Sequence, residues 1–341
     1  MVGIKSYIVG FVQENRFKGN TDRISDVKFS DINDEDLQNA LIWVSYDKTL
    51  KIWDKRSAEL IKSVESPSNQ PLYWVDNTSN MIMAGSQEHV MIWDLRKMKV
   101  LHHFTELHSD ECTSVKFNPH SPNFILTAGE DCLLNLLDLK DAENEDEYLE
   151  ASYTSEQPLS SCDFIGGTGL AYTITSINTV EIIDLETMLV VNNWNKFDHE
   201  INYSIQGQFL DGRMLFFMGN NLGEIYIYQY LQKQNEFQYL DVILTADQPN
   251  IGSLSESKVI RNAFWVDQQN VVVSSDTGDI YHYQLQDQVD ERPKLNINQE
   301  IDIKLNINPE TLSSEHQMME EDNEEMIDTN TSSKKKKYRP Y

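Results

Sequence analysis

Residues 40–54 read ALIWVSYDKTLKIWD: a short apolar run, a polar turn, and a second apolar run that ends in Trp-Asp. The same phrase returns as NMIMAGSQEHVMIWD at residues 80–94 and as FILTAGEDCLLNLLD at residues 124–138. Weaker copies end at Asp184, Gln229 and Gln284. Short runs rich in Val, Ile and aromatic residues, bounded by turn residues, indicate strands. The phrase therefore predicts a repeated pair of strands joined by a tight turn.

The spacing of the phrase predicts the architecture. The positions that match its final tryptophan are 40, 44, 46, 45 and 55 residues apart, close to the period of about 40–45 residues of a four-stranded propeller blade. These positions are Trp53, Trp93, Leu137, Ile183, Tyr228 and Tyr283. An alternating run precedes each phrase, as at residues 114–117, and another follows, as at residues 60–64. Because one sheet cannot bury both faces alone, the units must stack. We expect an all-β propeller in which helix is nearly absent.

The third unit carries a further pattern. His108-Ser109-Asp110 precedes its first strand, Thr127 lies in its second strand and Asp131 in the turn that follows. These residues resemble the loop histidine, strand hydroxyl and turn aspartate of the WD-repeat family. The resemblance runs from about residue 20 to residue 285. It implies a hydrogen-bonded structural set, although Leu137 replaces the tryptophan of that set.

The other units match the family less completely. The first unit keeps Asp47 and Trp53, but Gly19-Asn20 stands where the family has Gly-His. The second unit keeps Trp93, with Gln87 at the aspartate position. The resemblance therefore implies structural roles for Trp53, Trp93, His108, Thr127, Asp131 and Asp47.

The ends of the chain decide the number of blades. We recognise six full units and prefer seven blades, the seventh composite or incomplete; an unclosed ring is the alternative. Residues 4–9 and 11–17 are placed as the last two strands of a preceding blade, and residues 294–308 contain two further alternating runs. The propeller is expected over residues 1–308. Residues 309–341, acidic and then basic, are expected to form a disordered tail.

Charge narrows the class of partner. The formal net charge is −27, and the residues before Asp287 carry −22 of it. Such a surface disfavours nucleic acid and anionic membranes and attracts basic proteins. No apolar run approaches the roughly 18 residues of a membrane helix, and no signal peptide is evident. Three cysteines without metal-ligand spacing favour a reducing compartment.

No enzyme signature is present. The sequence has no phosphate-binding glycine loop, no nucleophile elbow and no His-Glu-x-x-His motif. His102-His103 lacks a third ligand at a suitable spacing. We expect a non-enzymatic protein that uses no catalytic residues, metal or cofactor.

Acidic loops are the candidate partner-binding site. The resemblance implies that the loops between blades, together with the turns between second and third strands, line one face of the propeller. The acidic side chains mapped to the loops between blades are Asp22, Asp110, Glu111, Glu156, Asp198, Glu200, Asp247 and Glu256. They predict a docking surface for a cationic protein; the alternative is that they only keep the protein in solution.

Two motifs suggest further interactions. The third strands of the first two units end in Trp53-Asp54-Lys55-Arg56 and Trp93-Asp94-Leu95-Arg96. This Trp-Asp-x-Arg pattern resembles that of WD-repeat substrate receptors of cullin–RING ubiquitin ligases, but such strand ends occur in many WD-repeat proteins for local packing, which is the favoured explanation. The candidate adaptor-binding residues are Trp53, Asp54, Arg56, Trp93, Asp94 and Arg96. A candidate nuclear localisation signal consists of Lys334, Lys335, Lys336 and Lys337.

Together these features predict a protein–protein interaction scaffold, nuclear or cytoplasmic, that is a monomer within a larger complex. Its partners are expected to be basic proteins, without direct nucleic-acid or membrane contact. Two alternatives stay open: an acidic chaperone or escort for a basic nuclear client such as a ribosomal protein or histone, and a ubiquitin-ligase substrate receptor.

Overall fold

The computed structural model describes residues 2–6, 19–30, 40–139, 147–197, 199–244, 259–265, 270–275 and 280–287. The chain divides into two units, Met1–Ile301 and Asp302–Tyr341, and every described residue belongs to the first. Residues 11–17, residues 294–308 and the tail lie outside the described residues. The seventh blade, the domain boundary at residue 308 and the disordered tail therefore stay predictions.

The described strands form six four-stranded antiparallel sheets, which we call blades 1 to 6. Blade 1 comprises β2 (Ile24–Phe29), β3 (Ala40–Ser45), β4 (Thr49–Asp54) and β5 (Leu60–Glu65). Blade 2 comprises β6 (Trp74–Asn77), β7 (Met81–Gly85), β8 (Val90–Asp94) and β9 (Lys99–Phe104). Blade 3 comprises β10 (Cys112–Phe117), β11 (Phe124–Gly129), β12 (Leu133–Asp138) and β13 (Leu149–Thr154).

Blade 4 comprises β14 (Leu159–Phe164), β15 (Leu170–Thr175), β16 (Val180–Asp184) and β17 (Leu189–Trp194). Blade 5 comprises β18 (Tyr203–Leu210), β19 (Arg213–Gly219), β20 (Glu224–Leu231) and β21 (Glu236–Leu244). Blade 6 comprises β22 (Ile260–Trp265), β23 (Asn270–Ser275), β24 (Ile280–Asp287) and β1 (Val2–Ser6).

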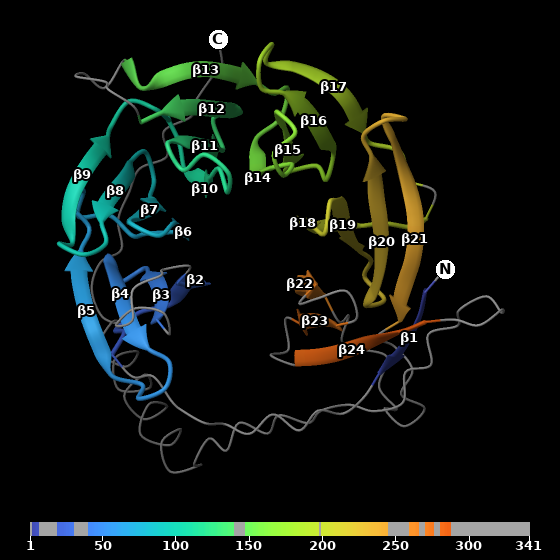
Figure 1. Ribbon diagram of the computed structural model, residues 1–341, viewed down its shortest axis with the longest axis horizontal. Helices are drawn as coiled ribbons and strands as arrows, with labels where there is room; N and C mark the ends of the chain where they lie inside the picture. Colours follow the sequence, from blue (N-terminus) through green and yellow to red (C-terminus); the bar gives the residue numbers. More distant parts are fainter. Residues whose placement is uncertain are drawn as a thin grey trace, which may run out of the picture. The chain divides into compact units, whose positions relative to one another are not determined.

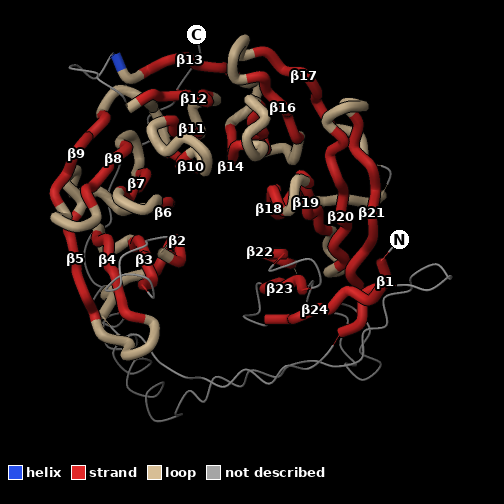
Figure 2. Tube along the Cα trace, viewed as in Figure 1, coloured by secondary structure: helices blue, strands red, loops and turns tan. Residues whose placement is uncertain are grey.

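The arrangement of the blades confirms the predicted propeller. In Figure 1 the first strand of each blade lies toward the inside of the unit, and the fourth strands of blades 1 to 5 lie at the outside. Neighbouring blades meet through these inner strands, as β2 meets β6 and β10 meets β14. No α-helix occurs in the described ranges, and a single 3₁₀ position at Glu147 precedes β13 (Figure 2).

The N-terminal strand corrects one expectation. Residues 4–9 were predicted to begin a separate preceding blade, as its third strand. Instead, β1 is the fourth strand of blade 6, where it pairs antiparallel with β24 and Val2 lies opposite Asp287. Sequence pattern could not assign this partner because the two strands lie at opposite ends of the propeller sequence.

The hydrophobic core lies between blades. One buried cluster joins Ile42 and Leu50 of blade 1 to Ile82 and Trp93 of blade 2, all at most 1% exposed. Another joins Leu126 of blade 3 to Ile183 of blade 4. Among the described residues, consecutive blades from 1 to 6 thus bury apolar faces against one another, as the repeat predicts.

Side chains of the inner strands also cross between blades. Asp26 of β2 accepts a hydrogen bond from the backbone N–H of Val75 (3.1 Å), and Asp76 of β6 accepts one from Phe117 (2.8 Å). Between blades 3 and 4, Lys116 Nζ lies 3.2 Å from Asp163 Oδ2. Burial raises the pKa of Asp76 above its usual range, although Lys116 opposes this shift. These contacts position each blade against the next.

Candidate partner-binding surface

Hydrogen bonds establish which loops share an end of the blades. The loops between blades contact the turns between second and third strands: Tyr46 N donates to Arg23 O, and Glu130 N donates to Glu111 O, both at 2.9 Å. We call this end the top face. At the opposite end, the bottom face, third-to-fourth-strand turns bond to first-to-second-strand loops, as Leu185 N does to Gly169 O (3.0 Å).

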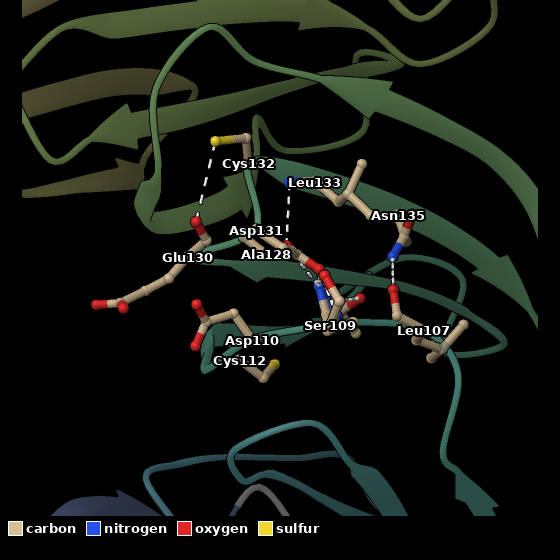
Figure 3. Close-up of polar contacts among 12 residues, drawn as sticks. Leu107, Ser109, Asp110, Cys112, Ala128, Glu130, Asp131, Cys132, Leu133 and Asn135 are labelled. Carbon is tan, nitrogen blue, oxygen red and sulfur yellow. Dashed lines mark hydrogen bonds and ion pairs between the residues drawn. The ribbon is translucent and has the colours of Figure 1, made fainter. Parts of the chain in front are cut away.

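Blade 3 contains the polar set that the family resemblance implies. His108 Nε2 lies 2.9 Å from Thr127 Oγ1, and His108 Nδ1 lies 3.1 Å from Asp131. Asp131 also accepts hydrogen bonds from the backbone N–H groups of Ser109 (2.9 Å) and Leu133 (3.2 Å; Figure 3). Burial opposes ionisation, but the His108 hydrogen bond and the backbone donors hold the pKa of Asp131 below its usual range. The set fastens the preceding loop to the turn.

Blade 1 makes the same junction with other residues. Asn20, at the histidine position, accepts a hydrogen bond from Trp43 Nε1 (3.2 Å). Asp47 accepts one from the backbone N–H of Thr21 (3.3 Å), as Asp131 does from Ser109. Asp47 also forms a buried ion pair with Lys51 at 2.8 Å. The Gly19-Asn20 departure from the family pattern therefore preserves the junction.

Blades 4 and 5 use residues that the sequence analysis missed. The buried carboxylate of Glu181 in β16 accepts hydrogen bonds from Tyr153, Ser155 and Thr173, at 3.1–3.2 Å. In blade 5, His199 Nδ1 lies 2.7 Å from the Tyr228 hydroxyl. His199 precedes its blade's first strand by four residues, as His108 does, and that spacing was the available signal.

Blade 2 joins its loop to its turn without a His-Thr-Asp set: Ser86 Oγ, in the turn after β7, donates to Gln70 Oε1 in the loop before β6 (3.4 Å). Trp93 is fully buried in the core, and within the described part of the chain its Nε1 has no hydrogen-bond partner. Met83 faces Ile92 across the strand pair, so the second strand offers no hydroxyl where blade 3 has Thr127.

The acidic loop residues lie where a partner could reach them. Asp22, Asp110, Glu156 and Glu200 are exposed, and Glu111 is half-buried. Figure 3 shows the carboxylates of Asp110 and Glu130 extending away from Asp131. The exposed Glu130, on a second-to-third-strand turn, adds to the predicted set. Asp198, Asp247 and Glu256 lie outside the described residues.

Like charges crowd part of this face. Burial, Glu130 and Asp110 together raise the pKa of Glu111 above its usual range, while Arg23 acts in the opposite direction. Arg23 itself lies over the ring of Tyr46, 3.9 Å from its centroid. A basic side chain from a partner would relieve this repulsion.

The Trp-Asp-x-Arg residues lie at the bottom ends of blades 1 and 2. Trp53 and Trp93 are buried core residues. Asp54 accepts a hydrogen bond from the backbone N–H of Arg56 (2.8 Å), and Asp94 accepts one from Lys97 (2.8 Å), so both close their turns. The arginines project outward, with the Arg56 side chain 66% exposed. Local packing accounts for these Trp and Asp residues; adaptor binding stays a prediction.

Other site chemistry is limited in the described ranges. No group of three or more His, Cys, Asp or Glu side chains there is arranged to hold a metal ion. Cys112, Cys132 and Cys162 are unpaired thiols. The described part of the chain contains no helix long and apolar enough to cross a membrane.

Comparison with known proteins agrees with this architecture. Residues 98–138, which include most of blade 3, match the family described as "WD domain, G-beta repeat". This match covers one repeat; together with the six described four-stranded sheets and the His108–Thr127–Asp131 set, it makes the chain similar to WD-repeat β-propellers.

Individual WD-repeat proteins match longer stretches. The chain is similar to WD repeat-containing protein 89 homolog of Dictyostelium discoideum, with 24% identity over 263 residues, 74% of this chain and 68% of that protein. It is 28% identical over 173 residues to WD repeat-containing protein GTS1 of Arabidopsis thaliana, covering 50% of this chain but only 44% of that relative's length. Histone acetyltransferase type B subunit 2 of Candida glabrata matches at 27% over 125 residues, 36% of this chain and 28% of that subunit.

Proposed function

We propose that this chain is an interaction scaffold that docks a basic protein on its top face. WD-repeat proteins generally act as non-enzymatic scaffolds for protein–protein interactions. The observation that carries the proposal is the distribution of carboxylates on this face. Asp22, Asp110, Glu156 and Glu200 are exposed on four different loops between blades. Clustered like charges cost stability and steer an oppositely charged partner toward the face that carries them.

The class of client follows from the same charge. The Candida glabrata relative is named as a subunit of a histone acetyltransferase, and histones are basic proteins. This relation supports an acidic chaperone or escort for a basic client, such as a histone or a ribosomal protein. On this proposal the partner's affinity comes from a few buried contacts, and the acidic loops set its rate of association and its specificity.

Charge reversal tests the proposal. The variant Asp110→Lys/Glu156→Lys/Glu200→Lys is compared with the bottom-face control Glu59→Lys/Glu186→Lys/Glu236→Lys, in which all three positions are also exposed. Binding of purified core histones is measured by fluorescence anisotropy at low and high ionic strength. We expect the top-face variant to lose about tenfold or more in affinity while the control changes little, because surface charges are screened beyond about 8–10 Å at moderate salt.

Salt dependence provides the second readout. The affinity of the parent protein should fall as ionic strength rises. Equal binding by the two variants, or an affinity indifferent to salt, would contradict electrostatic docking. The acidity would then serve only to keep the protein in solution.

A further inference from the structure

Two turn tips on the top face carry exposed aliphatic side chains. Ile177, between β15 and β16, is 61% exposed, and Leu222, between β19 and β20, is 65% exposed. The corresponding turns of blades 1 to 3 present polar or charged residues, including Tyr46, Glu88 and Glu130. Single exposed apolar residues are common on proteins, so exposure alone assigns no role. Their common location is more informative.

Hydrogen bonds connect these two turns through one residue. Asn178, next to Ile177, donates from Nδ2 to the Asn202 carbonyl (3.1 Å). The backbone N–H of Asn221, next to Leu222, donates to Asn202 Oδ1 (2.8 Å). Asn202 thus joins the tips of two neighbouring blades, and both aliphatic residues flank the same junction.

Both tips have a fixed backbone. Asn178 N donates to Thr175 O (2.9 Å), which closes the first turn. In the second turn, Asn220 Oδ1 accepts from the N–H groups of Leu222 and Glu224, each at 3.0 Å. A partner that covers these side chains would lose little loop entropy, because the backbone is already ordered.

Acidic residues lie beside the tips. Glu200, exposed, is two residues before Asn202. In addition, Ser176 N donates to Pro158 O (2.8 Å), which brings the loop of the exposed Glu156 to the turn of Ile177. A segment bound over both tips would therefore meet exposed carboxylates on the loops next to the aliphatic pair.

We propose that Ile177 and Leu222 form a paired apolar anchor for the partner, which places there a segment with apolar side chains between basic ones. This inference rests on the proposed function, because the basic part of the segment belongs to the cationic partner. It adds that charge alone does not select the ligand: an apolar contact at the junction of blades 4 and 5 discriminates among equally basic segments.

Two labelled octapeptides of equal charge separate the anchor from the charge. One alternates arginine and leucine, and the other alternates arginine and serine; an alternating glutamate–serine peptide is the negative probe. Anisotropy titrations are run on the parent, on Ile177→Ser/Leu222→Ser, and on the control Leu60→Ser/Leu189→Ser. The control positions are exposed leucines of outer strands, 46% and 65% exposed. Thermal melts establish that all three proteins are folded.

The parent and the control should bind the leucine peptide about tenfold or more tightly than the serine peptide, because two aliphatic side chains become buried. The anchor variant should lose this preference while keeping its affinity for the serine peptide. Equal binding of the two arginine peptides by the parent, or an unchanged preference in the anchor variant, would overturn the anchor and leave electrostatic docking intact. If neither arginine peptide bound better than the glutamate peptide, the proposed function would fail as well.

Discussion

At the scale of single residues, different side chains supply the hydrogen bonds that buried polar atoms need in blades 1, 3 and 4. His108 and Thr127 in blade 3, Asn20 and Trp43 in blade 1, and Glu181 with three hydroxyls in blade 4 all bond polar atoms in the interior of a blade or beside it. A buried polar group left without a partner costs about 1–3 kcal/mol. Each repeat can change its residues if the replacements still satisfy one another.

Asp131 allows this requirement to be measured. Replacing it with alanine removes an acceptor from His108 and from the N–H of Ser109, so Asp131→Ala should lower the free energy of unfolding by about 1–3 kcal/mol at neutral pH. Urea unfolding gives this value. The control is Glu130→Ala, which removes an exposed neighbouring carboxylate and should shift stability by less than about 0.5 kcal/mol.

We also expect the stability difference between the parent and Asp131→Ala to depend on pH. The pKa of Asp131 is lowered in the folded protein, so its contribution is fully present above the ordinary pKa of an aspartate. It is lost as pH falls through the lower, folded value. The stability difference between parent and Asp131→Ala should therefore narrow on acidification from neutral pH to about pH 3. A constant difference over that range would show that Asp131 contributes through packing rather than as a carboxylate.

At the scale of elements, side chains of the inner strands form hydrogen bonds that connect neighbouring blades. Gln208 of β18 makes two bonds to β22: its Nε2 donates to Trp265 O (2.9 Å), and its Oε1 accepts from Trp265 N (2.8 Å). The amide thus completes a backbone pairing between two sheets that share no strand. Similar cross-blade contacts by Asp26 and Asp76 join blades 1, 2 and 3.

Removing this amide should loosen blade 6 selectively. Gln208→Ala leaves both Trp265 backbone groups without their partner and should destabilise by about 1–3 kcal/mol. Amide hydrogen exchange should become faster in β22 than in β10, because opening of blade 6 no longer breaks these bonds. Gln234→Ala, on an exposed turn, is the matched control and should leave exchange in β22 unchanged. Uniform acceleration in all blades would argue for global destabilisation instead.

At the scale of the whole molecule, charge is divided unevenly along the chain. The residues before Asp287 carry a net −22, whereas Lys334–Lys337 form the longest basic run in the sequence. The acidic propeller sequence is therefore expected to attract basic partners, and the basic run is expected to attract acidic ones. We propose that the lysines direct part of the protein to the nucleus, where a basic client such as a histone is encountered.

Localisation of fluorescent fusions tests this proposal. Changing Lys334–Lys337 to alanine should deplete the nuclear fraction, because a nuclear import receptor reads a cluster of basic side chains. A variant that replaces the same lysines with arginine keeps the charge and should retain the parental distribution. Identical distributions of all three proteins would leave the run without a targeting role.

Much of the fold was predictable because its signal is local and repeated. The alternating runs at residues 114–117 and 161–164 became β10 and β14, with starts that differ by two residues. The His108–Asp131 pairing was predictable only through family resemblance. His199 could have been found from its position four residues before the first strand of its blade, which is also the position of His108. The role of Glu181 was not apparent, because its partners Tyr153, Ser155 and Thr173 lie on other segments of the chain.

The sequence by itself determined the strands, the four-stranded unit and its period, because alternation and turn residues act over a few neighbours and recur six times. It also determined the acidity on which the proposal of a basic partner rests. Only the tertiary structure decided that β1 completes blade 6, since that pairing joins strands nearly the whole propeller apart. It alone showed that Ile177 and Leu222 flank one junction. The exposure of these side chains and the distance between their turns depend on how neighbouring blades pack, which local sequence patterns do not specify.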